Sequence, residues 1–437
     1  MKDRNNALSL ITYLNLVYVP LATSFSEESA KAFGLDRDGA MRLTLACEEI
    51  FVYLCQTGRL DEPITVEAMD GKYYVQVRFL FQDPEFNPRA FNLTARVSFD
   101  DTDSLNEMGL LIASRTVDRF HIAGTPRLGL ELALIKEKAY SELADLNVPE
   151  IKPGRSFVVK TPEPESLKLF SRLIAAHYPE NASPPAFRLP GKLVDMISSG
   201  EYGAALAISE GGDIGGGVLW RWVGNKTVES FGPYLFNQPS GAELANNLLD
   251  SCLGRIAKTD AVGLLHRWGT PELPRSYFEP LGTIDFIQAD GLTTSRPVYY
   301  RHLNEDLGCR VWTHPDLEDF LQAEYGRLYF AREIRLIRHG GERRPAHSVF
   351  ATQFDRARGQ VTLRAIWDGE DVAENLAQHV AILKAENLRN MFFEVDLAYA
   401  WQANLLQALT ENKFRPRLIL PYGGEADVVV FQYAEGT

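Results

Sequence analysis

The segment FNQPSGAEL, residues 236–244, joins the apolar run TVESFGPYLF, residues 227–236, to the amphipathic run GAELANNLLDSCLGRIA, residues 241–257. The first run is typical of a buried β-strand and the second of a helix. A helix N-terminus presents free backbone N–H groups and the positive end of the helix dipole, and both favour an anion. The segment therefore predicts a strand-to-helix loop that can hold a phosphate. An ordinary turn without a ligand is the other reading.

The same alternation of strands and helices extends on both sides of this loop, over residues 155–303. Before the loop, the sequence predicts a strand, two helices and three strands separated by turns at residues 211–212 and 224–225. After the loop and its helix it predicts a strand, a helix over residues 272–281 and two final strands. Strands joined by helical crossovers should be parallel and strands joined by short turns antiparallel, so a mixed sheet flanked by helices is expected.

The loop carries Gln238 and Gly241 at the spacing of the pattern Q/R-x-x-G-x-G/A, with Glu243 at the last small position. This resembles the cofactor loop of the acyl-CoA N-acyltransferases of the GNAT type. The stretch SYFEPLG, residues 276–282, resembles the end of that family's fourth helix, with the tyrosine one place early, at Tyr277.

The resemblance implies direct attack of an amine on an acyl-CoA thioester, with acetyl-CoA as the default donor. Its implied CoA contacts are Phe236, Gln238, Gly241 and Ala242. Tyr277 would protonate the leaving thiolate. Glu229, or His266 as the other candidate, would act as general base, because an amine must be neutral to attack.

Residues 304–437 repeat the predicted order of strands and helices. Their equivalent loop, residues 368–371, has the sequence DGED, which lacks Q/R-x-x-G and whose carboxylates would repel a phosphate. We therefore expect a second, divergent copy of the GNAT-like domain that does not bind CoA.

Residues 1–150 predict a strand, two helices, a hairpin, a polar lid over residues 99–109, a helix and a second hairpin. This order resembles the GHKL ATPases, in the branch of the anti-sigma-factor serine kinases. The resemblance puts Glu49 and Asp83 in the nucleotide pocket, but Tyr53 stands where that family has an asparagine four residues after the glutamate. It implies a degenerate pocket, with binding of ATP and Mg²⁺ not expected. The expected fold is thus α/β: a GHKL-like α/β sandwich followed by two GNAT-like mixed-sheet domains.

Composition narrows the function classes. The chain has 437 residues and a net charge of −13, which disfavours broad nucleic-acid binding, since that needs a basic surface. Its four cysteines form no CxxC pair, so reduced thiols and no metal site are expected. No clean run of about 20 apolar residues is present, so a cytoplasmic location without a membrane span is expected.

Two functions stay open at this point. One is a CoA-dependent N-acyltransferase with a regulatory ATPase-like domain, acting on the amine of a small molecule or of a protein. The alternative is a non-catalytic bacterial regulator, an anti-sigma-like module plus pseudo-acyltransferase domains, that binds a protein of a sigma-factor pathway. An active ATPase or serine kinase is a third reading.

Overall fold

The computed structural model of the chain describes residues 7–83, 86–96, 107–125, 129–142, 148–151, 156–238, 242–288, 290–338 and 344–434. Two compact units are present. Unit 1 comprises residues 1–140, 343–352 and 364–382, and unit 2 comprises residues 141–342, 353–363 and 383–437. Both units combine helices with β-sheets, which confirms the predicted α/β fold class. The boundaries expected near residues 150 and 304 stay predictions.

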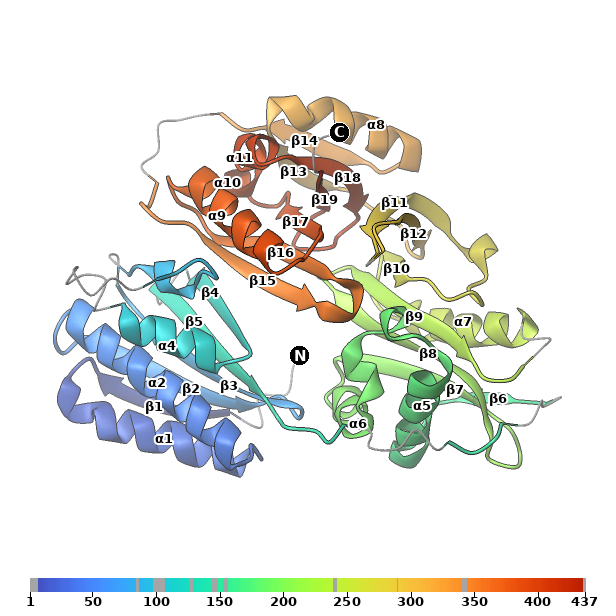
Figure 1. The fold of residues 1–437 in the computed structure, drawn as a ribbon, viewed down its shortest axis with the longest axis horizontal. Helices are drawn as coiled ribbons and strands as arrows, with labels where there is room; N and C mark the ends of the chain where they lie inside the picture. Colours follow the sequence, from blue (N-terminus) through green and yellow to red (C-terminus); the bar gives the residue numbers. More distant parts are fainter. Residues whose placement is uncertain are drawn as a thin grey trace. The chain divides into compact units, whose positions relative to one another are not determined.

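Unit 1 is built on a five-stranded antiparallel sheet in the order β1-β2-β3-β5-β4. The strands are β1 (Ala7–Tyr13), β2 (Pro63–Asp70), β3 (Tyr74–Phe81), β4 (Arg119–Thr125) and β5 (Gly129–Glu137). The helices α1 (Val19–Ala32), α2 (Arg37–Thr57) and α4 (Met108–Thr116) cover one face of this sheet (Figure 1). Burial alternates along β3, where Val75, Val77 and Phe79 point to the helices, as expected for a sheet with one covered face.

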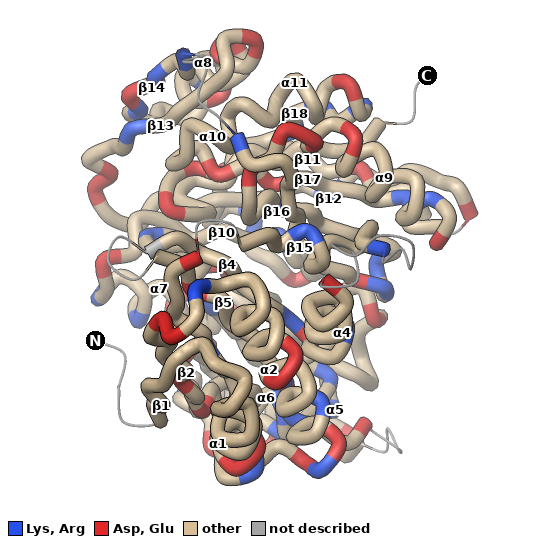
Figure 2. Tube along the Cα trace, turned by 90° about the vertical axis from the view of Figure 1, so that its left-hand side faces the viewer, with Lys and Arg blue, Asp and Glu red and all other residues tan. Residues whose placement is uncertain are grey.

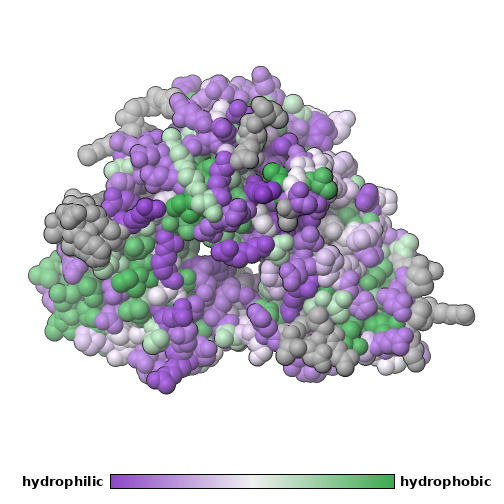
Figure 3. All heavy atoms as spheres, viewed as in Figure 1, coloured by the Kyte–Doolittle hydropathy of each residue, from purple (hydrophilic) through white to green (hydrophobic). Residues whose placement is uncertain are grey.

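The surface of unit 1 is uneven in polarity. Acidic and basic residues follow one another along α1 (Figure 2). The Lys31 ammonium group lies within 3.0 Å of the carboxylates of both Glu27 and Glu28. Apolar atoms gather over α1 and α2 (Figure 3). The exposed large apolar residues there include Leu16, Val17, Leu21, Met41 and Leu45.

Unit 1 is completed by chain segments far from residue 140. These belong to β15 (Val349–Asp355), β16 (Gln360–Trp367) and α9 (Val372–Ala385), of which unit 1 holds residues 349–352, 364–367 and 372–382. Val349 is fully buried in the core that α2, β3 and α4 share, and Ile366 and Trp367 pack against it. Unit 1 is therefore discontinuous in sequence.

Unit 2 contains a seven-stranded sheet in the order β11-β12-β10-β9-β8-β7-β6. Its strands are β6 (Val158–Lys160), β7 (Tyr202–Ile208), β8 (Ile214–Val223), β9 (Thr227–Leu235), β10 (Gly263–Trp268), β11 (Glu279–Ile287) and β12 (Thr293–His302). β9 and β10 pair in parallel, and they are joined by the crossover helix α7 (Ala242–Ile256); the other neighbouring strands of the sheet pair antiparallel. The predicted mixed sheet is thus present.

Helices lie on both faces of this sheet (Figure 1). A Cβ atom on Gly216 would come within 3.3 Å of Leu248 in α7, whereas one on the next residue, Gly217, would come within 2.6 Å of Phe170 in α5 (Pro164–His177). Because successive residues of a strand point to opposite faces, α7 covers one face and α5 the other, together with α6 (Pro190–Ser198).

The helix predicted over residues 272–281 is wrong. Only a short 3-10 turn, η5 (Arg275–Tyr277), forms there, and β11 begins at Glu279. Pro280 explains the difference, because proline has no N–H to continue a helix and disfavours the helical conformation of the residue before it.

The remaining elements form two further sheets. β13 (Cys309–Thr313) pairs in parallel with β14 (Arg332–Leu336), and α8 (Pro315–Leu328) connects them. The last sheet has the order β15-β16-β17-β19-β18 and includes β17 (Asn390–Asp396), β18 (Phe414–Leu420) and β19 (Val428–Tyr433). Between β17 and β18 lie α10 (Ala400–Ala403) and α11 (Leu406–Glu411). In chain order, this arrangement matches β8-β9-β10-β12-β11 of the larger sheet.

Candidate functional sites

The first candidate site lies where β9 runs past the end of its pairing with β10. The parallel register ends at Phe231, while β9 continues to Leu235. Phe236 donates its N–H to the carbonyl of Gly215 on the β8 side, so the N–H of Leu235 points to the opposite edge, where β10 has ended. In an acyl-transfer site, free backbone N–H groups of such an edge would receive the thioester carbonyl.

Side chains of the chain itself occupy this edge. Leu235 donates its N–H to the Tyr178 hydroxyl at 2.7 Å, and that hydroxyl donates to the Leu235 carbonyl at 3.1 Å. Pro233 has no N–H, and its carbonyl accepts a hydrogen bond from Thr270 Oγ1 at 2.9 Å. The backbone groups of Pro233 and Leu235 that face the gap are therefore satisfied internally.

Aromatic rings fill the space beside the same edge. Tyr178 packs edge-to-face on Tyr234 at a centroid distance of 5.1 Å and on Phe236 at 6.2 Å. Phe236, one of the expected CoA contacts, is fully buried and lies 5.8 Å from Phe170 of α5. Burial raises the pKa values of the Tyr178 and Tyr234 phenols. These residues form core, and this arrangement does not fit a pantetheine chain lying along β9.

The loop that follows β9 is only partly described. Gln238 donates from its amide to the carbonyl of Phe236 at 3.0 Å, and the Asn237 amide donates to the carbonyl of Ile151 at 2.7 Å. Ala242 is exposed at the start of α7. Gly241, the other expected phosphate contact, lies outside the described residues.

Glu229, the expected general base, is fully buried and ion-paired. Its carboxylate accepts from Arg267 at 2.7 and 3.1 Å and from Arg221 at 3.0 and 3.2 Å. Burial opposes ionisation, but the two guanidinium groups outweigh it and lower the pKa of Glu229 to about 2. The group is thus a structural counter-ion, with little driving force to take a proton from an amine.

His266 lies on the other face of the sheet. Its Nδ1 is 3.1 Å from Ser230 Oγ, and its ring packs against Phe278 at 5.8 Å. Ser230 and Glu229 are consecutive in β9, so His266 and Glu229 face opposite sides and cannot act on the same proton. Burial lowers the pKa of His266 to about 4.

Tyr277 lies in η5, against α7. Slight burial and a hydrogen bond with Asp250 of α7 raise the pKa of its phenol. The Arg301 guanidinium stands 5.3 Å over the ring and donates to the Tyr277 carbonyl at 2.9 Å. These contacts hold Tyr277 on the α7 face, the face that also carries His266.

In unit 1, Glu49 and Asp83, which were expected to line a degenerate nucleotide pocket, are tightly packed. A Cβ atom on Gly109 at the start of α4 would come within 2.7 Å of a Glu49 carboxylate oxygen. Burial, and then the neighbouring Glu48, raise the pKa of Glu49. Asp83 is buried just before Phe86, whose ring lies 5.3 Å from Phe81 and 6.0 Å from Tyr53.

An open pocket of about 690 Å³ lies elsewhere in unit 1, and the sequence did not indicate it. Its walls are the segment 89–96, the start of α4, and one side of α9 with His347. The lining residues are Arg89, Ala90, Asn92, Thr94, Ala95, Arg96, Glu107, Leu111, His347, Asp371, Glu374, Asn375, Gln378, Ala381 and Ile382.

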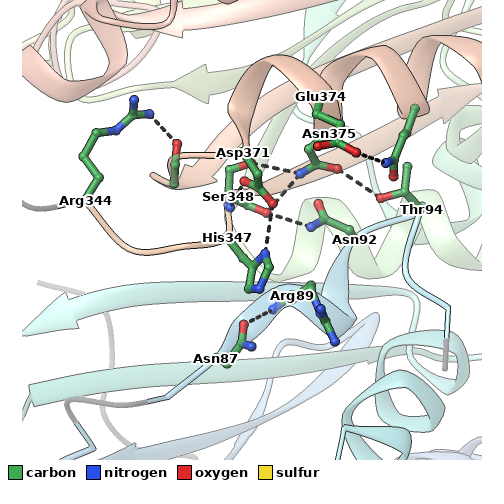
Figure 4. A network of polar contacts seen from close by, with 12 residues as sticks. Asn87, Arg89, Asn92, Thr94, Arg344, His347, Ser348, Asp371, Glu374 and Asn375 are labelled. Carbon is green, nitrogen blue, oxygen red and sulfur yellow. Dashed lines mark hydrogen bonds and ion pairs between the residues drawn. The ribbon is translucent and has the colours of Figure 1, made fainter. Parts of the chain in front are cut away.

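A buried polar network fixes the walls of this pocket (Figure 4). The Asn92 amide donates to the Ser348 carbonyl at 2.7 Å and accepts from the Phe350 N–H at 3.0 Å. Asn375 donates to the same carbonyl at 3.0 Å and accepts from Thr94 at 3.0 Å. Segments more than 250 residues apart in sequence are therefore joined by side-chain amides.

The charged groups of the pocket are partly paired. Asp371 accepts from the Ser348 N–H at 2.6 Å and lies 3.1 Å from His347 Nδ1. Glu107 accepts from Arg89 at 2.8 and 3.0 Å. At the turn before α9, Arg344 binds the Asp368 carboxylate.

Comparison with known proteins gives structural neighbours only. The sequence matches no protein-family model and no curated protein. Three similar solved structures are a GNAT phosphinothricin acetyltransferase from Sinorhizobium meliloti in complex with AcCoA, an acetyltransferase of the GNAT family from Staphylococcus aureus, and the GNAT family N-acetyltransferase YhbS from Escherichia coli in complex with CoA. They share 19, 16 and 17% identity, cover 35, 34 and 36% of this chain and 90, 100 and 86% of their own, and have TM-scores of 0.29, 0.26 and 0.26. Similarities of this size carry no inference about activity.

Two further properties concern only the part of the chain that the structure describes. None of its helices is long and apolar enough to cross a bilayer. In the same residues, no three His, Cys, Asp or Glu side chains lie close enough together to hold a metal ion.

Proposed function

We propose that this protein is a non-catalytic regulator in which an acyltransferase-like domain, residues 155–303, serves binding to a protein partner instead of acyl transfer. The observation that carries the proposal is the closed edge of β9, where Tyr178 and Thr270 satisfy the backbone groups of Leu235 and Pro233. An oxyanion needs donors that are free when the substrate arrives.

The ionisable residues support the same proposal. Glu229 is tied to two arginines at 0% exposure, and His266 is buried on the opposite face. A general base must reach the proton that it removes, directly or through one water molecule. Neither residue meets this condition in the arrangement described.

A CoA-dependent N-acyltransferase is the second candidate, with a small-molecule or protein amine as acceptor. It is favoured by the parallel pairing of β9 and β10 around α7, and by the loop with Gln238 that precedes this helix. It requires Tyr178 to leave Leu235 when the donor binds. Its expected site residues are those named from the sequence: Glu229, His266 and Tyr277 for chemistry, and Phe236, Gln238, Gly241 and Ala242 for CoA.

Calorimetric titration with acetyl-CoA separates the two candidates. We expect no heat of binding at millimolar acetyl-CoA for folded protein. Stoichiometric binding would overturn the regulator and support the transferase. Tyr178→Phe, which frees the Leu235 N–H, is titrated in parallel, with Tyr329→Phe as control because Tyr329 is 94% exposed.

The partner is tested by affinity capture of the tagged full chain from cells of its own source. We predict recovery of a protein of a sigma-factor pathway, and binding must then be reproduced with the two purified proteins. If a sigma factor and its antagonists all fail to bind the purified chain, that choice of partner is wrong, whatever the outcome of the CoA titration.

A further inference from the structure

The pocket of about 690 Å³ in unit 1 differs from the β9 edge because it is open, and its size lies within the range of small-molecule sites. None of the expected catalytic, CoA-binding or nucleotide-binding residues lines it, although Glu107 of the predicted lid and Asp371 of the predicted loop over residues 368–371 do. Its occupant can be argued from the charges on its walls.

Basic and acidic side chains lie on different walls of the pocket. The segment 89–96 supplies the basic residues Arg89 and Arg96. Asp371, just before α9, and Glu374, in α9, supply acidic groups (Figure 4). Arg89 is neutralised by Glu107, and Asp371 is held by the Ser348 N–H and His347. Arg96 and Glu374 are then the charges most available to a ligand.

The availability of these two groups follows from their contacts. Both side chains are exposed. Among the residues with described positions, Arg96 has no ion pair or hydrogen bond, and Glu374 accepts only a 3.2 Å hydrogen bond from Gln378. An ion of one sign would meet a like charge on one of the walls, whereas a molecule with separated charges of both signs would meet an opposite charge on each.

The uncharged lining suits a carbon skeleton between the charged ends. Ala90, Leu111, Ala381 and Ile382 contribute apolar surface to the pocket. The walls are preorganised, because Asn92 and Asn375 are buried and hydrogen-bonded to Ser348. Preorganisation lowers the entropic cost of binding.

From this geometry we infer that the pocket between α4, the segment 89–96 and α9 binds a small zwitterion of the α-amino-acid class. The carboxylate faces Arg96, the ammonium group faces Glu374, and the side chain lies against Leu111 and Ile382. This inference is independent of the proposed function, because it concerns another site in another unit.

The test is a thermal-shift and calorimetric screen of the full chain against the individual L-α-amino acids at millimolar concentration. At least one amino acid is expected to raise the unfolding midpoint and to bind with 1:1 stoichiometry. Its analogue without the amino group and its analogue without the carboxylate are expected to bind at least tenfold more weakly.

Two variants locate the site. Arg96→Ala and Glu374→Gln are each expected to weaken binding at least tenfold without changing the unfolding midpoint of the free protein, since both side chains are exposed. Glu165→Gln, at an exposed position on α5 in unit 2, serves as control and should bind as the unmodified chain does.

Three results would overturn the inference. One is a screen in which no amino acid binds. Another is binding that survives both Arg96→Ala and Glu374→Gln. The third is equal binding of an analogue that carries only one charge, which would mean a simple anion or cation site.

Discussion

The edge of β9 and the pocket beside α9 differ in whether a ligand can enter them. The edge of β9 follows from a recognisable sequence pattern, yet Tyr178, Thr270 and buried aromatic rings close it. The pocket beside α9 has no sequence signature, yet it is open and lined by charged groups. A strand order predicts where a site can form, whereas the side chains that meet there decide whether it is open.

The largest effect is expected from Glu229→Gln, which tests whether the stability of the sheet around β9 depends on the buried ion pairs of Glu229. The change leaves Arg221 and Arg267 without their shared counter-ion, and breaking a buried pair costs about 3–5 kcal/mol. The free energy of unfolding of unit 2, measured by denaturant titration, should fall by this amount. Glu165→Gln at an exposed position is the control. A loss below about 1 kcal/mol, the range of surface pairs, would show that Glu229 is not structural.

The next largest effect is a loss of stability at low pH, which one buried histidine in each unit should cause. Burial lowers the pKa values of His266 in unit 2 and His379 in unit 1 to about 4. The unfolded chain has histidine pKa values near 6.5, so below this pH it takes up protons that the folded chain does not. Stability is therefore full above about pH 6.5 and declines as the pH falls towards 4, by about 3 kcal/mol for each histidine.

Unfolding midpoints between pH 7.5 and 4.5 check this dependence. His266→Asn should flatten the decline for unit 2, and His379→Asn should flatten it for unit 1. His302→Asn is the control, because His302 is exposed. A pH dependence that none of these variants alters would contradict the assignment to buried neutral histidines.

A third prediction concerns the turn before α9, beside the pocket. A Cβ atom on Gly369 would come within 2.1 Å of the Ser348 nitrogen and 2.3 Å of the His347 carbonyl carbon. Gly369→Ala should therefore destabilise unit 1 by about 1–3 kcal/mol, as measured by chemical denaturation. Gly254→Ala is a matched control, because Gly254 lies within α7 with no atom near its Cβ position and should gain up to about 1 kcal/mol.

The smallest effect is expected from Tyr178→Phe, which removes a hydroxyl but keeps the ring. It leaves the buried Leu235 N–H and carbonyl without their partner, and we expect a loss of about 1 kcal/mol for the missing hydrogen bonds. Tyr329→Phe should have no effect on the unfolding midpoint. If Tyr178→Phe gained measurable affinity for CoA, the edge of β9 would be a binding site that the Tyr178 hydroxyl blocks in the unliganded chain.

Local patterns were sufficient to predict much of the fold. The strand–loop–helix pattern around residues 227–257 predicted β9, α7 and the parallel pairing with β10. The helix predicted over residues 272–281 did not form because Pro280 favours an extended chain, which β12 then pairs. The glycine turns predicted the antiparallel strands correctly.

The sites were harder to predict, because they depend on contacts between distant residues. Glu229 has a place in β9 that the sequence indicates, but Arg267, which lowers its pKa, is 38 residues away. The pocket walls are further apart still, since Thr94 and Asn375 are separated by 281 residues. No periodicity in the sequence reports such a pairing.

The discontinuity of unit 1 bears on how the protein is made. The ribosome synthesises residues 1–140 long before residues 343–352 and 364–382. These later segments complete the same core, to which they contribute Val349 and Trp367. At a usual synthesis rate of about 5–20 residues per second, the first segment waits roughly ten seconds to a minute for the parts of β15, β16 and α9 that complete it. During that interval the nascent chain carries an incomplete core, which makes chaperone contact at this stage of translation an expected part of its biogenesis.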